Sequence, residues 1–217
     1  MDANQAPGPV DAAAAAALDT IWRLGGRRAA EDMSVMAGED FFLSEVSFRQ
    51  LPVEELSSLL GSPDELISTV LLEIRGDCRG EVLLLLPQRF SDELASILFA
   101  GCELTPEEAA ANRAGALREA GNILGSAFLN AVSLLTGLEV LPTVPELAED
   151  MLGAVLDIIQ IKHAARENHL FLAESGIRRG AKPLDLFLIA IFERPSLELI
   201  VERLHDADER RTSEGPP

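Results

Sequence analysis

The sequence is poor in the residues and motifs that carry most metal, redox and nucleotide chemistry. It has two cysteines, Cys78 and Cys102, and no cysteine pair at metal-ligand spacing. Its three histidines, His163, His169 and His205, also lack that spacing. No GxSxG, GxGxxG or phosphate-loop motif occurs, so neither a classical nucleophile site nor a nucleotide site is supported. We expect two free thiols rather than a disulfide, no metal site and no cofactor of the protein's own.

Basic residues are also scarce. There are 18 Lys and Arg against 36 Asp and Glu, a net charge of -18, which repels nucleic-acid backbones and anionic membranes. No apolar run approaches the roughly 20 residues that a bilayer requires. The apolar start, residues 11–18, follows an acid and lacks the basic region of a signal peptide. The sequence predicts a cytoplasmic protein with no nucleic-acid partner and no membrane insertion.

What is present suits a folded core. The chain has 217 residues, of which 47% are hydrophobic and 25% charged, enough for one domain or two small ones. Residues 1–10 contain two prolines and a glycine, and residues 206–217 are polar and end in Gly-Pro-Pro. We expect both ends to be flexible.

The first half of the chain alternates between helical and extended patterns. Periodicity, glycines and prolines predict a helix over 12–36 with a break at Gly25-Gly26, a strand over 41–50, a short helix over 52–60, strands over 65–74 and 80–86, and a helix over 91–99.

The second half repeats this order. Thr105 and Glu108 form a capping box, and the helix that they start runs to Thr136 and ends at Gly137. After it the pattern predicts a strand over 138–144, a helix over 149–163, strands over 169–177 and 184–192, and a closing helix over 195–204. Pro142 predicts that the strand over 138–144 lies at a sheet edge.

The repeated order predicts an α+β fold with internal duplication. Two halves, 12–101 and 105–205, would be related by a pseudo-twofold axis within a single domain over 1–217. Strands joined by tight turns are antiparallel, so six strands would form a mainly antiparallel sheet flanked by long helices.

One face of the long central helix carries a narrow polar stripe. Glu119 and Asn122 are three positions apart and therefore share this face. The stripe continues through small or polar residues, namely Gly115, Ser126, Asn130 and Ser133. A stripe with few charges on an apolar helix suits a docking surface. The pair alone would better suit solvated residues on an amphipathic helix.

The pattern Glu119-x-x-Asn122, followed by Pro145, resembles the signature of the chemotaxis phosphatase family of CheC, CheX and FliY. Flanking segments, including residues 119–131 and 76–87, also resemble this family, and CheC more than its other members. The similarity spans most of residues 12–205. The resemblance implies hydrolysis of the aspartyl phosphate on a phosphorylated CheY-type receiver domain. Glu119 and Asn122 would be catalytic.

The resemblance also implies contacts and partners. The expected binding residues are Gly115, Ser126, Asn130 and Pro145. In the implied mechanism Asn122 holds a water in line with the phosphoryl group, while Glu119 pairs with a lysine of the receiver. Mg²⁺ would come from the receiver, and the receptor deamidase CheD is a second candidate partner.

The chain departs from the family pattern at three positions. In the first half Thr20 stands where the glutamate is expected and Arg23 where the asparagine is expected. In the second half Gly115 stands where the family often has Asp or Ser. We expect one active motif, and the alternative is a weak or inactive adaptor that binds a receiver domain or CheD.

Overall fold

The structure, a computed structural model, describes residues 12–51, 60–99, 103, 105–163, 169–179 and 182–214. The first half contains α1 (Ala12–Ala37), β1 (Phe41–Leu51), β2 (Leu66–Gly76), β3 (Gly80–Pro87) and α3 (Gln88–Leu98). The second half contains α4 (Pro106–Thr136), β4 (Val140–Pro142), β5 (Glu146–Met151), α5 (Leu152–His163), β6 (His169–Arg179), β7 (Lys182–Phe192) and α6 (Arg194–Glu214). The predicted short helix over 52–60 lies, except for Leu60, outside the described residues, as does Cys102.

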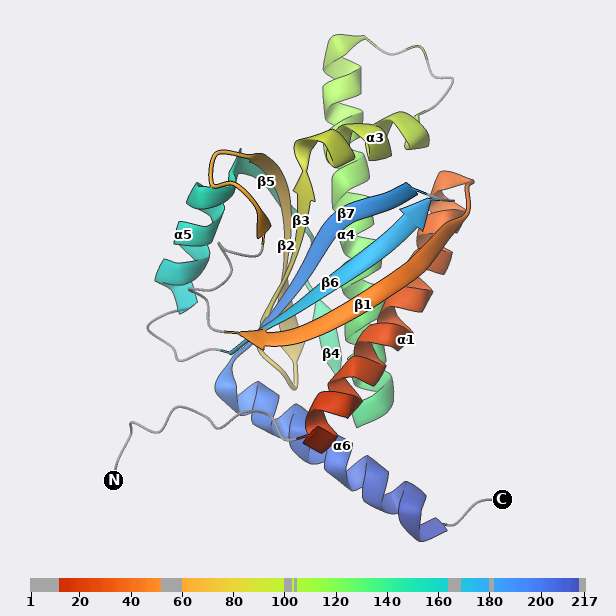
Figure 1. The fold of residues 1–217 in the computed structure, drawn as a ribbon, viewed down its shortest axis with the longest axis vertical. Helices are drawn as coiled ribbons and strands as arrows, with labels where there is room; N and C mark the ends of the chain where they lie inside the picture. Colours follow the sequence, from red (N-terminus) through yellow and green to blue (C-terminus); the bar gives the residue numbers. More distant parts are fainter. Residues whose placement is uncertain are drawn as a thin grey trace.

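All of these strands belong to one sheet in the order β1-β6-β7-β3-β2-β4, with β5 also paired to β2 (Figure 1). Each pairing is antiparallel, which confirms the predicted α+β fold. β4 is the last strand in this order, so the edge position predicted from Pro142 is confirmed.

The sheet has seven strands, one more than predicted. The sequence assigned the residues from 149 onward to a helix, whereas 146–151 form β5 and pair with Leu66–Leu71 of β2. The side chains of β5 are mostly exposed, so the strand lacks the alternation of buried and exposed residues that marks a strand in sequence. Its pairing with β2 decides its conformation.

The arrangement is symmetric under exchange of the two halves. If β1 is exchanged with β4, β2 with β6, and β3 with β7, the order of strands across the sheet is reversed and otherwise unchanged. The register of β1 shifts between Leu43 and Val46, and the matching edge of the second half breaks between β4 and β5. These features are consistent with the predicted duplication, which stays a prediction.

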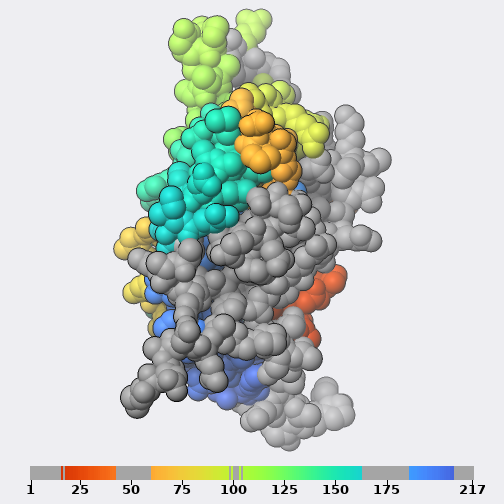
Figure 2. Space-filling model, turned by 60° about the vertical axis from the view of Figure 1, so that its left-hand side comes forward, coloured from red at the N-terminus to blue at the C-terminus, as the bar shows by residue number. Residues whose placement is uncertain are grey.

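Helices cover both faces of the sheet. α1 and α4 lie side by side on one face, over a large core that includes Leu72, Leu84 and Leu188 (Figure 1). α5 covers the other face over a smaller core, and it forms one surface with the start of β2 (Figure 2). Every residue of β3 after Gly80 is buried.

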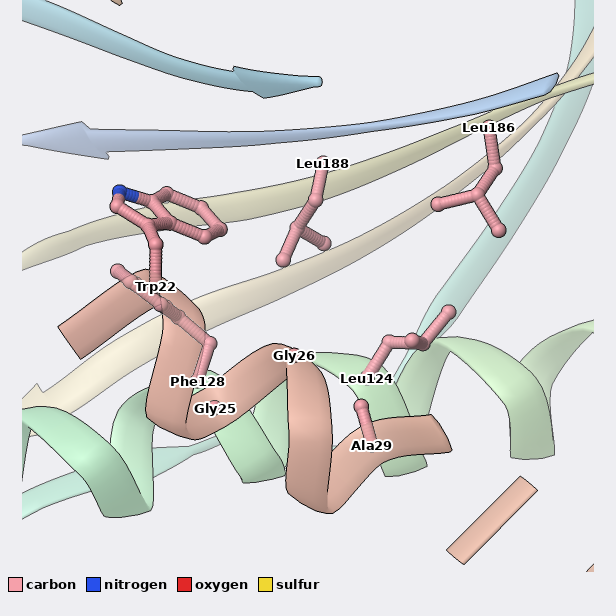
Figure 3. A pocket seen from close by; sticks show the side chains of 8 residues that line it. All are labelled: Trp22, Gly25, Gly26, Ala29, Leu124, Phe128, Leu186 and Leu188. Carbon is pink, nitrogen blue, oxygen red and sulfur yellow. The ribbon is translucent and has the colours of Figure 1, made fainter. Parts of the chain in front are cut away.

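Glycines set the distance between the helices and the sheet. A Cβ at Gly121 of α4 would overlap Val70 of β2, and one at Gly125 would lie 2.9 Å from Leu72 Cδ1. Where α1 crosses α4, a Cβ at Gly25 would lie 2.9 Å from Phe128 Cα. Figure 3 shows this crossing, a small apolar gap between the two helices and β7.

Two expectations about helix ends are wrong. α1 is continuous through Gly25 and Gly26, because Gly25 serves the close crossing with α4 rather than a break. The closing helix was expected to end at residue 204, whereas α6 continues to Glu214. Buried Leu197, Ile200 and Leu204 anchor that helix, and its later residues include the good helix formers Ala207, Glu209, Arg210 and Arg211. The flexibility expected of residues 206–217 stays a prediction.

The described cysteine is a buried free thiol. Cys78 has no disulfide, and burial, together with the charge of the neighbouring Asp77, raises the pKa of its thiol to about 11. The thiolate, which is the reactive form, is therefore suppressed at neutral pH.

Two glycines of α4 provide a matched test of the packing. Gly115→Ala adds its methyl group to open space and should stabilise the protein by about 0.5–1 kcal/mol, since glycine weakens helix interiors. Gly121→Ala must push against Val70 and should destabilise it by about 1–3 kcal/mol. Urea unfolding of both variants measures the difference. Equal effects would contradict the close approach of α4 to β2.

Arg113 of α4 connects its helix to three other elements, α3, β5 and β2. Its guanidinium donates to Asp92 of α3 at 2.7 Å, to Glu149 of β5 and to the hydroxyl of Ser68 of β2 at 3.4 Å. Ser68 is buried, donates to Glu149 at 2.8 Å and accepts from Ser91 at 3.0 Å. The hydrogen bond from Arg113 lowers the pKa of Glu149, and the bond from Ser68 adds to this effect.

This network predicts a pH-dependent contribution to stability. The pKa of Glu149 is lower in the folded protein than its usual 4.5, so the stabilisation is present above that pH and is lost as the pH falls through the folded value. Arg113→Met should therefore cost about 1–2 kcal/mol at pH 7, a modest value because Glu149 and Asp92 are half exposed. Urea unfolding between pH 7 and about pH 3 should show this cost shrinking.

The exposed pair of Arg75 and Glu73 supplies the control. Arg75→Met should change stability by no more than about 0.5 kcal/mol at any of these pH values. A cost for Arg113→Met that stays constant on acidification would show that the residue acts only through packing of its stem.

Candidate functional site

The site lies on α4, a 31-residue helix with well-defined ends. The Thr105 hydroxyl accepts a hydrogen bond from the backbone N–H of Glu108, and the Glu108 carboxylate accepts one from the N–H of Thr105. Gly137 ends the helix with φ 72°, a left-handed conformation that suits glycine. The predicted capping box and the predicted helix end at Gly137 are confirmed. The residues between them belong to one continuous helix.

Glu119 and Asn122 lie away from the sheet. Gly121 and Gly125 mark the side of α4 that touches β2, and Glu119 points to the opposite side, where it is exposed. Asn122 is half-buried at the border between these two sides. Among the described residues no hydrogen bond or ion pair engages the Glu119 carboxylate, so it is available to an external cation.

Ser126 fixes one end of the Asn122 amide. Its hydroxyl donates to Asn122 Oδ1 at 3.4 Å, across one helical turn. Within the described part of the chain no hydrogen bond uses the amide nitrogen of Asn122. That nitrogen is therefore a donor for a molecule from outside the protein.

The other stripe residues divide into open and engaged ones. Gly115 and Asn130 are exposed, and nothing lies within 4 Å of a Cβ built at Gly115. Ser133, by contrast, accepts a hydrogen bond from the N–H of Val140 at 3.3 Å and fastens β4 to the end of the helix. It is a structural contact rather than part of an open docking face.

Pro145 lies in the connection between β4 and β5, beside the helix. Thr143 in this connection exchanges hydrogen bonds of 2.9 Å with the backbone of Glu73 in β2. Leu147, after it, pairs with Val70, the residue beneath Gly121. Pro145 therefore lies at the sheet edge, at about the same height along α4 as the helical turn from Asn122 to Ser126. No described contact joins it to Asn122, so its place in the site rests on this register alone.

The first half presents different chemistry at the corresponding positions. Ser34 accepts from the N–H of Phe41 across seven residues, as Ser133 does from Val140, and aligning these pairs places Thr20 opposite Glu119 and Arg23 opposite Asn122. The Thr20 hydroxyl donates to Ala16 O at 2.9 Å, and Arg23 Nε donates to Asp19 at 2.6 Å. Both polar groups are occupied within α1.

The sequence reasoning missed Arg118. It is exposed on α4 and lies four residues before Asn122, hence on the same row of the helix as Asn122 and Ser126. The spacing of four and the lack of an acidic residue one turn away were both visible in the sequence.

The described residues contain no group of three or more His, Cys, Asp and Glu side chains placed to hold a metal ion. None of the helices described is both long enough and apolar enough to cross a membrane.

Comparison with known proteins found relatives in sequence and several similar folds. The chain is 26% identical over 141 residues to the CheY-P phosphatase CheC of Bacillus subtilis (strain 168), covering 64% of this chain and 68% of the relative. It resembles the crystal structure of Thermotoga maritima FliY with a TM-score of 0.71 and 16% identity, over 92% of this chain and 99% of that one. The FliM middle domain from H. pylori gives 0.57 and 18%, over 89% and 99%. No family model matches.

Proposed function

Because these similarities support the CheC/CheX/FliY family, we propose that this protein is a chemotaxis phosphatase that hydrolyses the aspartyl phosphate of a CheY-type receiver domain. The observation that carries the proposal is the free amide nitrogen of Asn122, beside the exposed and unpaired Glu119 on a rigid helix. The similarity to CheC supplies the substrate class.

The reaction requires few chemical groups from this protein. Phosphoryl transfer is accelerated mainly by positioning the attacking water and stabilising charge. The Asn122 amide is too weak a base to take a proton, but it can hold a water by a hydrogen bond. Ser126 holds the other end of the amide, so less freedom is lost when that water binds.

Glu119 acts in docking. A carboxylate repels a phosphoryl group unless a cation lies between them, so we assign Glu119 to a lysine on the receiver. Its exposed position allows such a pair to form across the interface. The receiver supplies the phosphorylated aspartate and Mg²⁺, which neutralises charge on the phosphoryl oxygens. Such a partner places the protein in the cytoplasm.

The first half contributes no catalysis in this proposal. Thr20 and Arg23 replace the catalytic pair, and both are held by α1 itself. This loss also motivates the competing function, an adaptor that binds a receiver or CheD without hydrolysis. The two functions differ in whether the rate of dephosphorylation changes.

The test follows loss of phosphate from a phosphorylated CheY-type receiver with Mg²⁺ present. Wild-type protein should accelerate the loss, and Asn122→Ala should reduce the accelerated rate about 10²–10³-fold, by analogy with removal of one oxyanion donor. Binding of the receiver should change little, because the amide acts on the water. Stopped assays with labelled phosphate measure the rate.

A matched control and two outcomes make this decisive. Asn112→Ala changes the same residue type on the same face of the helix, about two turns before Glu119, and should keep the wild-type rate. Binding without acceleration by the wild type would favour the adaptor. Full activity of Asn122→Ala would remove the amide from the mechanism.

Gly115 gives a second test of the site. A serine side chain at this position would enter open space one turn before Glu119, so Gly115→Ser should fold normally and keep or raise the phosphatase rate. Activity and thermal midpoint should be measured together. Complete loss of activity in a folded variant would mean that the partner's surface fills this space.

A further inference from the structure

Arg118 is the cation nearest to the proposed water-positioning amide along α4. Side chains four residues apart on a helix are neighbours, and the corresponding positions of α1 show the reach, since Arg23 Nε lies 2.6 Å from Asp19 Oδ2. The Arg118 and Asn122 side chains can therefore act on one bound group.

No carboxylate competes for Arg118. Three other described arginines on helices have acidic partners: Arg23 pairs with Asp19, Arg28 with Glu31 and Asp32, and Arg113 with Asp92 and Glu149. Arg27 and Arg203, like Arg118, form no ion pair among the described residues. The residues three or four positions from Arg118 are Ala114, Gly115, Gly121 and Asn122. Across the described residues no hydrogen bond or ion pair engages its guanidinium.

Arg118 differs from the other unpaired arginines in lying one helical turn from Asn122, and the proposed substrate gives it a role there. The net charge of -18 repels an anionic partner at long range. A phosphorylated aspartate beside the acidic groups of a receiver is such a partner. A guanidinium is always charged and matches two phosphoryl oxygens at once, whereas the Asn122 amide carries no charge.

We infer that Arg118 binds the phosphoryl group of the partner and makes this protein select the phosphorylated over the unphosphorylated receiver. The inference rests on the proposed phosphatase function and adds a substrate-binding residue to it. Asn122 holds the water, Glu119 pairs with a cation of the receiver, and Arg118 binds the phosphoryl group. Exposure of Arg118 and the open space at Gly115 allow the partner to approach.

The experiment measures affinity for two states of one receiver. The probe is a CheY-type receiver with Mg²⁺, either free or loaded with beryllofluoride as a stable mimic of the phosphoryl group. Wild-type protein should prefer the loaded form. Arg118→Gln should weaken binding of the loaded form roughly tenfold, the size expected for one charge-assisted hydrogen bond, and leave binding of the free form unchanged.

Two further variants separate the effect of the charge at position 118 from the effect of the protein's overall charge. Arg118→Lys keeps the charge without the planar fork and should recover part of the preference. Arg27→Gln removes the same charge from an exposed position on α1 and should behave like the wild type. Raising the salt concentration should reduce the preference of the wild type more than that of Arg118→Gln.

The outcomes distinguish this inference from the function on which it rests. If the wild type neither binds the loaded receiver nor accelerates dephosphorylation, the proposed function is wrong. If the wild type does both and Arg118→Gln matches Arg27→Gln, only the role of Arg118 is wrong. An equal loss of affinity for loaded and free receiver would assign Arg118 to carboxylates of the partner and overturn the phosphoryl contact.

Discussion

The close approach of α4 to β2 is the constraint on which the rest of this structure depends. Gly121 and Gly125 remove the side chains that would hold the helix away from Val70 and Leu72. With that side of the helix committed to the sheet, the opposite side faces solvent along its length. The orientation of Glu119, Asn122 and Arg118 thus follows from two missing methyl groups rather than from contacts of their own.

A site built in this way has little internal chemistry. It holds one amide fixed by a neighbouring hydroxyl, one free carboxylate and one free guanidinium, spread over two turns of a capped helix. No described cluster could hold a metal. Such a surface suits a reaction whose electrophile and metal arrive with the partner, because the helix then needs only to present groups at fixed spacing.

Local signals predicted the fold where they determine the conformation. The capping box of Thr105 and Glu108, the stop at Gly137 and the apolar hairpin strands required no tertiary information. The sequence failed where distant contacts decide. β5 is a strand because β2 lies beside it, and α1 passes through Gly25 because Phe128 lies against it.

The candidate site shows the same division. The shared face of Glu119 and Asn122 follows from helix periodicity, whereas the level of Pro145 along the sheet edge required the sheet register. Arg118 lies outside the Glu119-x-x-Asn122 motif, so the motif alone does not indicate it although its spacing from Asn122 is visible in the sequence. The engagement of Ser133 with Val140 could not be read from the stripe, since the hydroxyl is polar in either role.

The shared sheet has a consequence for how the two halves change over evolutionary time. β1 and β4 lie at opposite ends of one continuous sheet, and both helices rest on a common core. Residues on the outer side of α1, such as Thr20 and Arg23, are exposed and contribute little to that core. Selection for a folded protein therefore leaves them free to drift, so the outer side of α1 can change while the shared sheet and core still support α4.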